Sequence, residues 1–127
     1  MRIAICSNNQ DLNSPVDDRF GRCAYFVLVD KTGNLVKAVS NSSLNSPQGA
    51  GIAAAQLMIN NQVDTVLTGR IGPKAMKPLQ TAGINIYTGI SGTVKQTFDL
   101  FSKGSLTQLN AANSPRHGVS RPAEGRA

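Results

Sequence analysis

Residues 63–75, VDTVLTGRIGPKA, contain the strand, turn and helix start that decide the fold. The apolar, β-branched run over residues 63–68 predicts a buried strand. The two glycines that follow predict a tight turn, and Pro73 suits the first turn of a helix. Residues 84–93, INIYTGISGT, repeat this order of strand, Thr-Gly turn and helix start. Two successive units of this kind predict parallel strands joined by right-handed crossovers, the arrangement of an α/β sheet.

Three further strands and the helices complete the expected fold. Residues 31–34, KTGN, favour a hairpin turn, and the alternating strand after it favours a sheet edge. Pro78 predicts that the second helix is kinked or split, because proline removes a backbone donor from the helix interior. We expect strands at residues 2–6, 24–30, 35–40, 63–68 and 84–88 and helices at 51–61, 72–82 and 93–103. This order, βββαβαβα, predicts a mixed five-stranded sheet with helices on its faces, an α/β fold of the ribonuclease H-like type.

The chain length of 127 residues fits one domain with a single core, and 40% of the residues are hydrophobic. We expect this domain to span residues 1–106. From residue 107 onward small, polar and Arg residues dominate, so residues 107–127 are predicted to form a disordered tail. No apolar run reaches the roughly 20 residues that span a bilayer, and the apolar start of the chain is shorter than a signal peptide requires. A cytoplasmic protein without membrane contact is expected.

The formal net charge is +6, and residues 1–106 carry ten Lys and Arg residues against six Asp residues. A basic surface favours an anionic partner. Nucleic acid is an unfavourable candidate, because aromatic residues make up only 5%, Trp is absent and no run of Lys or Arg occurs. An enzyme is also not expected. The scattered Asp residues do not form the carboxylate cluster of a metal-dependent nuclease, and no base stands beside a nucleophile.

Glycine-rich segments lie at each expected entry into a helix. The carboxyl ends of parallel strands meet at one sheet edge, which is the usual ligand site of open α/β sheets. Helix N-termini there present unpaired N–H groups and a positive dipole end, and glycine lets a ligand approach the backbone. With basic residues beside them, these segments predict an anion pocket built from three helix N-termini. The alternative is that the glycines only form tight turns and helix caps.

Residues 17–23, DDRFGRC, join the first two expected strands. If these strands pair antiparallel, Cys6 and Cys23 become neighbours at the same sheet end, together with Arg19 and Arg22. Thiolates suit soft metals and nearby arginines would lower a thiol pKa, so the two cysteines are candidate metal ligands. The alternatives are salt bridges to the two acids that open the loop, and cysteines that serve as small buried hydrophobic residues. A His-based metal site is not expected, because the one histidine lies in the predicted tail.

Four motifs in this order resemble the dinitrogenase iron–molybdenum cofactor biosynthesis family: RFGR at 19–22, GAG at 49–51, TGRIGPKA at 68–75 and SGT at 91–93. The resemblance covers about residues 1–106 and implies a ribonuclease H-like fold that handles metal–sulfur clusters non-covalently. By position and charge, the implied cluster-binding residues are Arg19, Phe20, Gly21, Arg22, Gly49, Gly51, Gly69, Arg70, Ile71, Gly72, Lys74, Ser91, Gly92 and Thr93.

One departure narrows the role that the resemblance implies. Nitrogenase-associated members of the family often carry His at the position of Arg19, and some have His-rich tails. Their absence here argues against direct iron ligation. The chain looks closer to the branch that includes the orange protein, which holds a molybdenum–copper sulfide cluster. Such a cluster is a polyanion, so it needs N–H groups and arginines more than it needs ligands.

We therefore expect a non-catalytic carrier or scaffold for an anionic metal–sulfur cluster, either an iron–molybdenum precursor or a molybdenum–copper sulfide. The basic residues named above would neutralise the cluster, and Phe20, Ile71 and Ile90 would screen it from water. A partner protein that donates or receives the cluster is implied. The alternative is a protein-interaction or regulatory module that keeps the fold and has lost the ligand.

Overall fold

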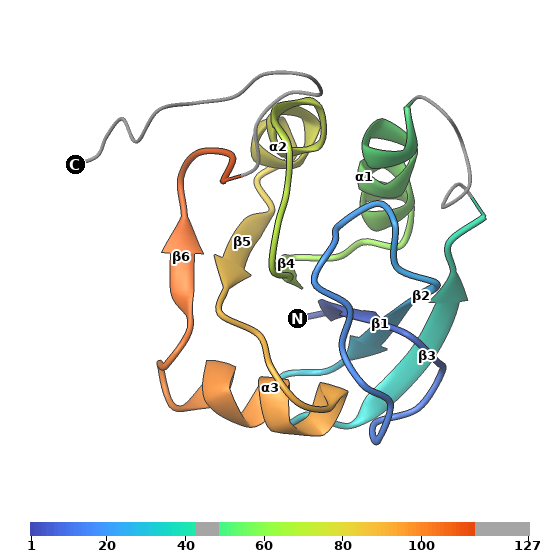
Figure 1. Cartoon of the computed structure of the whole chain (residues 1–127), viewed down its shortest axis with the longest axis vertical. Coiled ribbons are helices and arrows are strands. Elements are labelled where there is room, and N and C mark those ends of the chain that lie inside the picture. Colours follow the sequence, from blue (N-terminus) through green and yellow to red (C-terminus); the bar gives the residue numbers. More distant parts are fainter. Residues whose placement is uncertain (43–48, 114–127) are drawn as a thin grey trace.

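The computed structural model describes residues 1–42 and 49–113 and shows a mixed sheet with helices on both faces (Figure 1). In chain order, the elements are β1 (Ile3–Ser7), β2 (Tyr25–Val29), β3 (Leu35–Ser40), α1 (Ala50–Asn60), β4 (Thr65–Leu67), α2 (Pro73–Thr81), β5 (Asn85–Thr88), α3 (Val94–Ser102) and β6 (Thr107–Leu109). Through α3 this order matches the predicted βββαβαβα, and each helix end lies one residue from its predicted position. The predicted tail beyond residue 113, with the histidine, lies outside the described residues.

Six strands form one sheet in the order β3-β2-β1-β4-β5-β6. The strands β1, β4 and β5 run parallel, as the repeated strand–turn–helix units predicted, and β3 lies at an edge. The predicted count of five strands is wrong, because Thr107–Leu109 pairs antiparallel with β5. The predicted tail therefore starts too early, since residues 107–113 belong to the fold. A strand of three mostly exposed residues has no hydrophobic alternation, so the sequence pattern did not reveal it.

Alternate strand residues divide the core between the two faces of the sheet. On one face, Cys6, Phe26 and Val66 pack with α1 and α2. On the other face, Ile5 and Leu67 pack with α3. Figure 1 shows the same division, with α1 and α2 on one side of the sheet and α3 on the other. The helix N-termini therefore do not all open on the same face.

The second helix was predicted to be kinked or split at Pro78. It runs without interruption over Pro73–Thr81, so it is not split there. A proline at this position removes one helical hydrogen bond. Ala75, Met76 and Leu79 are buried against the sheet, and this packing holds the short helix together.

In the part of the chain that the structure describes, no helix is long and apolar enough to cross a membrane.

Candidate anion-binding site

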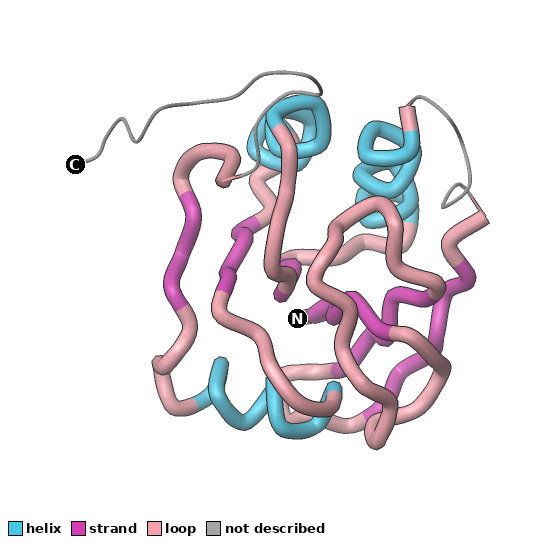
Figure 2. The backbone as a smooth tube through the Cα atoms, in the orientation of Figure 1, coloured by secondary structure: helices cyan, strands magenta, loops and turns pink. Residues whose placement is uncertain are grey.

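The candidate site lies where the loop between β1 and β2 runs beside the turn that joins β4 to α2 (Figure 2). Two backbone hydrogen bonds join these segments. Phe20 N–H donates to the Arg70 carbonyl at 3.0 Å, and Arg70 N–H donates to the Asp18 carbonyl at 2.6 Å. Arg19 and Arg70 are thereby paired in a short parallel bridge. The two segments that the sequence placed at one sheet edge are in direct contact.

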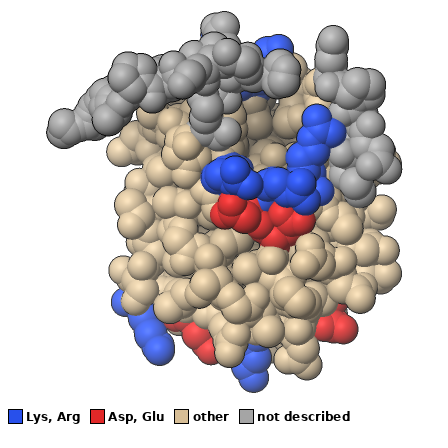
Figure 3. Space-filling view, viewed as in Figure 1, with Lys and Arg blue, Asp and Glu red and all other residues tan. Residues whose placement is uncertain are grey.

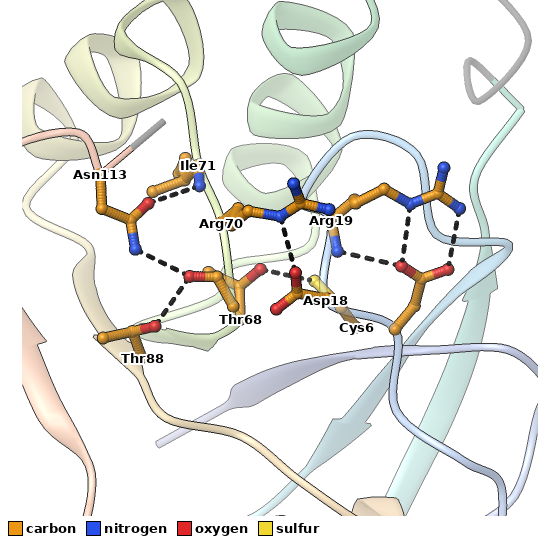
Figure 4. A network of polar contacts seen from close by, with 10 residues as sticks. Cys6, Asp18, Arg19, Thr68, Arg70, Ile71, Thr88 and Asn113 are labelled. Atoms are coloured by element: carbon orange, nitrogen blue, oxygen red, sulfur yellow. Dashed lines mark hydrogen bonds and ion pairs between the residues drawn. The ribbon is translucent and has the colours of Figure 1, made fainter. Parts of the chain in front are cut away.

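Each arginine of this bridge has an acidic partner (Figure 4). Arg70 Nε lies 2.6 Å from Asp18 Oδ2, and Arg19 Nε lies 3.4 Å from Asp17 Oδ1. The Asp17 carboxylate raises the pKa of the Arg19 guanidinium. The Arg19 and Arg70 side chains nevertheless stay 54% and 60% exposed. Since a guanidinium has five N–H donors, these ion pairs leave donors that can reach an external anion.

The same face carries more basic than acidic groups around this bridge. Figure 3 shows Lys and Arg side chains gathered directly against acidic side chains near the middle of the face. Lys74 is exposed in the first turn of α2, and Arg22 is half-buried in the loop. The salt bridge that the sequence offered as an alternative is formed between Arg19 and Asp17. The basic side chains around the bridge, here called the rim, still outnumber the acidic ones, so the rim carries a positive balance of charge.

Three of the predicted glycines stand where backbone segments touch. A Cβ at Gly69 would overlap the carboxylate of Asp18, so only glycine lets the loop and the turn meet. Gly21 has a φ of +93°, and a Cβ on it would lie 3.1 Å from the Cα of Gly51. A Cβ on Gly51 would in turn lie 3.2 Å from the Cβ of Ala75. These glycines let the loop, the β4–α2 turn, α1 and α2 pack closely together, a role beyond the tight turns and helix caps that the sequence offered as the alternative to anion binding.

Two helices, α1 and α2, begin beside this contact. Gly49, with a φ of 76°, precedes α1, and Gly72 precedes α2; neither N-terminus has a side-chain cap hydrogen bond among the described residues. Gly49 is exposed and Gly72 is half-buried. The N–H groups of a first helical turn have no partner within the helix, and the dipole end is positive. Both N-termini can therefore receive an anionic group.

The N-terminus of α3 does not join the site. Gln96 N–H donates to Thr93 Oγ1 at 3.1 Å, and the Gln96 side chain accepts from Thr93 N–H at 2.9 Å, which completes a capping box. The next two N–H groups, on Val94 and Lys95, donate to carbonyls of the β1–β2 loop at 2.9 Å. The predicted anion pocket of three helix N-termini therefore keeps only two of them, those of α1 and α2. The predicted ligand residues that surround this cap are Ser91, Gly92 and Thr93.

Cys6 and Cys23 lie together in the core beneath the loop, as antiparallel pairing predicted. Both are fully buried, and the Cys6 thiol donates to Thr68 Oγ1 at 3.4 Å. Burial, followed by contact with Cys23, raises the pKa of the Cys6 thiol well above its usual value. The expectation that nearby arginines lower this pKa is wrong, because desolvation dominates. Across residues 1–42 and 49–113, no group of three or more His, Cys, Asp or Glu side chains is placed to hold a metal ion.

The three predicted apolar screening residues lie inside the protein or on the other face. Phe20 and Ile71 are only 7% and 1% exposed. The Phe20 ring packs against Phe26 with centroids 5.4 Å apart. Ile90 packs with the core cluster under α3. Phe20 and Ile71 therefore anchor the loop and the turn to the core rather than cover a ligand.

An open groove of about 480 Å³ lies between α1 and α2. Ile52 is 49% exposed there, and neither helix contains an acidic residue. The groove thus combines apolar surface with two lysines close to the N-terminus of α2. Its lining residues are Ile52, Pro73, Lys74, Lys77 and Pro78.

Two side chains outside the predicted site set hold the turn under Arg70 (Figure 4). Thr88 Oγ1 donates to the Gly69 carbonyl at 2.7 Å. Asn113 Nδ2 donates to the same carbonyl at 2.8 Å, and Asn113 Oδ1 accepts from Ile71 N–H at 2.8 Å. An asparagine that lies 44 positions beyond Gly69 in a polar segment gives no local signal, so only the fold reveals this contact.

A third side chain fixes the other end of the loop. Asn41 is buried, and its Nδ2 donates to the carbonyls of Gly21 and Cys23 at 3.0 and 2.9 Å. Asp17 N–H donates to the Cys6 carbonyl at 3.0 Å. The loop is therefore tied at both ends as well as to the turn.

The fold and the site define a small α/β protein whose sheet edge presents paired arginines and two helix N-termini that no side chain caps within the described part of the chain, an arrangement suited to an anionic ligand. Residues 1–104 match the family described as "Dinitrogenase iron-molybdenum cofactor", and the chain belongs to this family. The resemblance inferred from the four motifs is thereby confirmed.

Individual relatives align with most of this chain. The orange protein of Desulfovibrio gigas, solved in its apo form, is 38% identical with a TM-score of 0.83, and the match covers 89% of this chain and 96% of that chain. A NifB-type protein of Thermotoga, assigned to the DUF35 family, is 34% identical with a TM-score of 0.78, over 92% of this chain and 98% of that chain. An uncharacterized protein of Methanocaldococcus jannaschii is 31% identical over 112 residues, which make up 86% of this chain and 92% of that relative.

Proposed function

We propose that the protein is a non-catalytic carrier or scaffold for an anionic metal–sulfur cluster, with a role in metallocofactor assembly. The family is named for the iron–molybdenum cofactor, which supports a metallocofactor-related role. The similar orange protein was solved in an apo form, which implies that it also has a loaded form. The observation that carries the proposal is the Arg19–Arg70 bridge beside the N-termini of α1 and α2, which no side chain of residues 1–42 and 49–113 caps.

The residues at this edge fit a polyanion better than a single metal ion. Three arginines and Lys74 stand against two carboxylates, Asp17 and Asp18, so the rim has a positive balance. The first-turn N–H groups add neutral donors that do not need to be deprotonated. Cys6, by contrast, would have to lose a proton inside the core before it could bind a metal. We therefore propose that charge and hydrogen bonds hold the cargo, without direct ligation.

The proposal names the chemical class of the cargo, an anionic metal–sulfur cluster, and not one particular cluster. An iron–molybdenum precursor and a molybdenum–copper sulfide cluster are both anionic, and either suits this rim. A cytoplasmic location and a partner protein that donates or receives the cluster belong to the same proposal. The ribonuclease H-like motif is proposed at the level of the fold, and the order β3-β2-β1-β4-β5 with an antiparallel β2 supports it.

The test is to load the purified protein with tetrathiomolybdate and copper. Unbound metal is removed by gel filtration, and the visible spectrum and the metal content are measured. We expect a stable chromophore at a fixed ratio of metal to protein. A protein that emerges colourless would refute the proposal.

A matched pair of variants tests the role of the arginines. Arg19→Gln with Arg70→Gln should weaken retention by tenfold or more, since a hydrogen bond to a charged group contributes about 1.5–3 kcal/mol. Lys95→Gln with Lys103→Gln removes the same charge from α3 and from its C-cap residue, on the opposite face, and should retain the chromophore. Equal retention by the two double variants would show that the arginine pair does not hold the cargo.

A second candidate function is a protein-interaction module, and the groove between α1 and α2 is the observation that favours it. Ile52→Ser and Lys77→Ser should then reduce the amount of a partner that co-purifies from the native host. The metal content should stay unchanged in these variants. Loss of metal together with the partner would assign the groove to the cargo instead.

A further inference from the structure

The turn that carries Arg70 is held by a residue from the far end of the described chain (Figure 4). Asn113 Nδ2 donates to the Gly69 carbonyl and Asn113 Oδ1 accepts from Ile71 N–H, both at 2.8 Å. The backbone N–H of Asn113 also donates to the Ile71 carbonyl at 3.2 Å. Thr88 Oγ1 adds a bond to the Gly69 carbonyl at 2.7 Å. The residues on both sides of Arg70 are therefore fixed.

The strand β6 brings this asparagine into place. Thr107–Leu109 pairs antiparallel with β5. Leu109 and Ala112 pack against the core on the α1 and α2 face, and Gln80 Nε2 donates to the Asn110 carbonyl at 2.9 Å. Packing and backbone pairing seat the segment independently of the asparagine side chain. Removal of the carboxamide alone should therefore leave the segment attached.

The hydrogen bonds of Asn113 with Gly69 and Ile71 are called the clamp below. The clamp matters because Arg70 is exposed while its two neighbours in the chain are buried. Gly69 and Ile71 have little access to water, so their peptide groups need partners within the protein. When both are held, the backbone of Arg70 has one conformation, and its side chain starts beside Arg19. Without the clamp the arginine would sample more orientations, and an anion would have to order it on binding.

We propose that Asn113 is a positioning residue for Arg70, so that the C-terminal segment sets how tightly the site retains an anionic ligand. The inference rests on the proposed function, because Arg70 must contact the cargo. Asn113 acts through the turn, since its carboxamide is already engaged by Gly69 and Ile71.

The test uses the full-length chain loaded with tetrathiomolybdate and copper, and it measures the rate at which the chromophore is lost on dilution. Asn113→Ala should speed this loss about tenfold, comparable to one lost hydrogen bond to a charged group. Gln108→Ala is the matched control. It removes a carboxamide from the same segment, where Gln108 Nε2 donates to Asn85 Oδ1 at 3.2 Å, and retention should stay unchanged. Hydrogen exchange at Ile71 N–H should become faster in Asn113→Ala and not in the control.

A double-mutant cycle with Arg70→Gln separates positioning from general destabilisation. If Asn113 acts through Arg70, Asn113→Ala should add little to the effect of Arg70→Gln. Full additivity of the two effects, or unchanged retention in Asn113→Ala, overturns the inference and leaves the proposed function standing. A wild-type chain that retains no chromophore overturns the proposed function, and this inference with it.

Discussion

Replacing Gly69 with Ala should break the contact between the β1–β2 loop and the β4–α2 turn. The added Cβ would overlap Oδ1 of Asp18 and would lie 2.6 Å from its Cγ and 2.7 Å from its carbonyl oxygen. The carboxylate can rotate away, but the carbonyl belongs to the backbone, so the loop itself must shift. That shift would disturb the backbone hydrogen bond and the ion pair between Arg70 and Asp18, both at 2.6 Å.

Three terms set the expected size of this effect. Forcing an extra carbon into a packed contact costs about 1–3 kcal/mol. The lost backbone hydrogen bond adds about 1 kcal/mol, and the exposed ion pair adds less than about 1 kcal/mol. We expect the free energy of unfolding to fall by about 2–5 kcal/mol. For a chain of this size, each kcal/mol lowers the melting temperature by roughly 3–5 °C.

The assay is urea unfolding followed by circular dichroism, because the chain has no Trp to report by fluorescence. Gly72→Ala is the control in the same turn: Gly72 has a φ of −87°, and no atom lies within 4 Å of a Cβ built on it. This variant should stay within about 0.5 kcal/mol of the wild type. If Gly69→Ala were as stable as Gly72→Ala, the loop would not be seated on the turn, and the arginine bridge would have to be rejected.

Three further variants test the surroundings of the site. Asn41→Ala leaves two loop carbonyls without their buried donor and should lower the free energy of unfolding by about 2–3 kcal/mol in the same urea assay. Thr93→Ala removes the cap of α3 and should cost about 1 kcal/mol, while chromophore retention stays unchanged, since α3 lies on the opposite face; reduced retention would place α3 in the site after all. The raised pKa of Cys6 means that the unfolded chain ionises first, so stability should be full below the ordinary thiol pKa of 9.0 and fall as the pH rises above it; Cys6→Ala should flatten this alkaline slope, and an unchanged slope would assign it to other groups.

The parts of the fold that could be predicted have local signals. The β-branched run at 63–68 and the glycine turn after it define a strand and a helix start within a dozen residues, and the structure confirms both. The missed parts depend on partners far along the chain. β6 is three residues long and acquires its identity only by pairing with β5. Pro78 suggested a break, but the buried side chains around it hold the helix together.

The candidate site divides in the same way. The positions of Arg19 and Arg70 at one sheet edge follow from topology, which the sequence pattern supplied. The Asp17 partner of Arg19 was foreseen only as an alternative, because sequence proximity does not decide between an ion pair and a free side chain. The Asp18 partner of Arg70 was not foreseen, because the two residues lie far apart in the sequence. The clamp by Asn113 could not be foreseen at all, since its partners are backbone groups whose position is set by tertiary structure.

The β1–β2 loop explains why the site can use two helix N-termini and not three. In its first half, Val16 N–H donates to the Gly92 carbonyl at 3.0 Å, and the carbonyls of Leu12 and Ser14 accept the first N–H groups of α3 at 2.9 Å. The bonds from Leu12 and Ser14 occupy the first N–H groups at the N-terminus of α3. The second half turns to the other face and places Arg19 beside Arg70. Because one continuous segment does both, the loop that occupies the N-terminus of α3 also places the arginine pair beside the N-termini of α1 and α2.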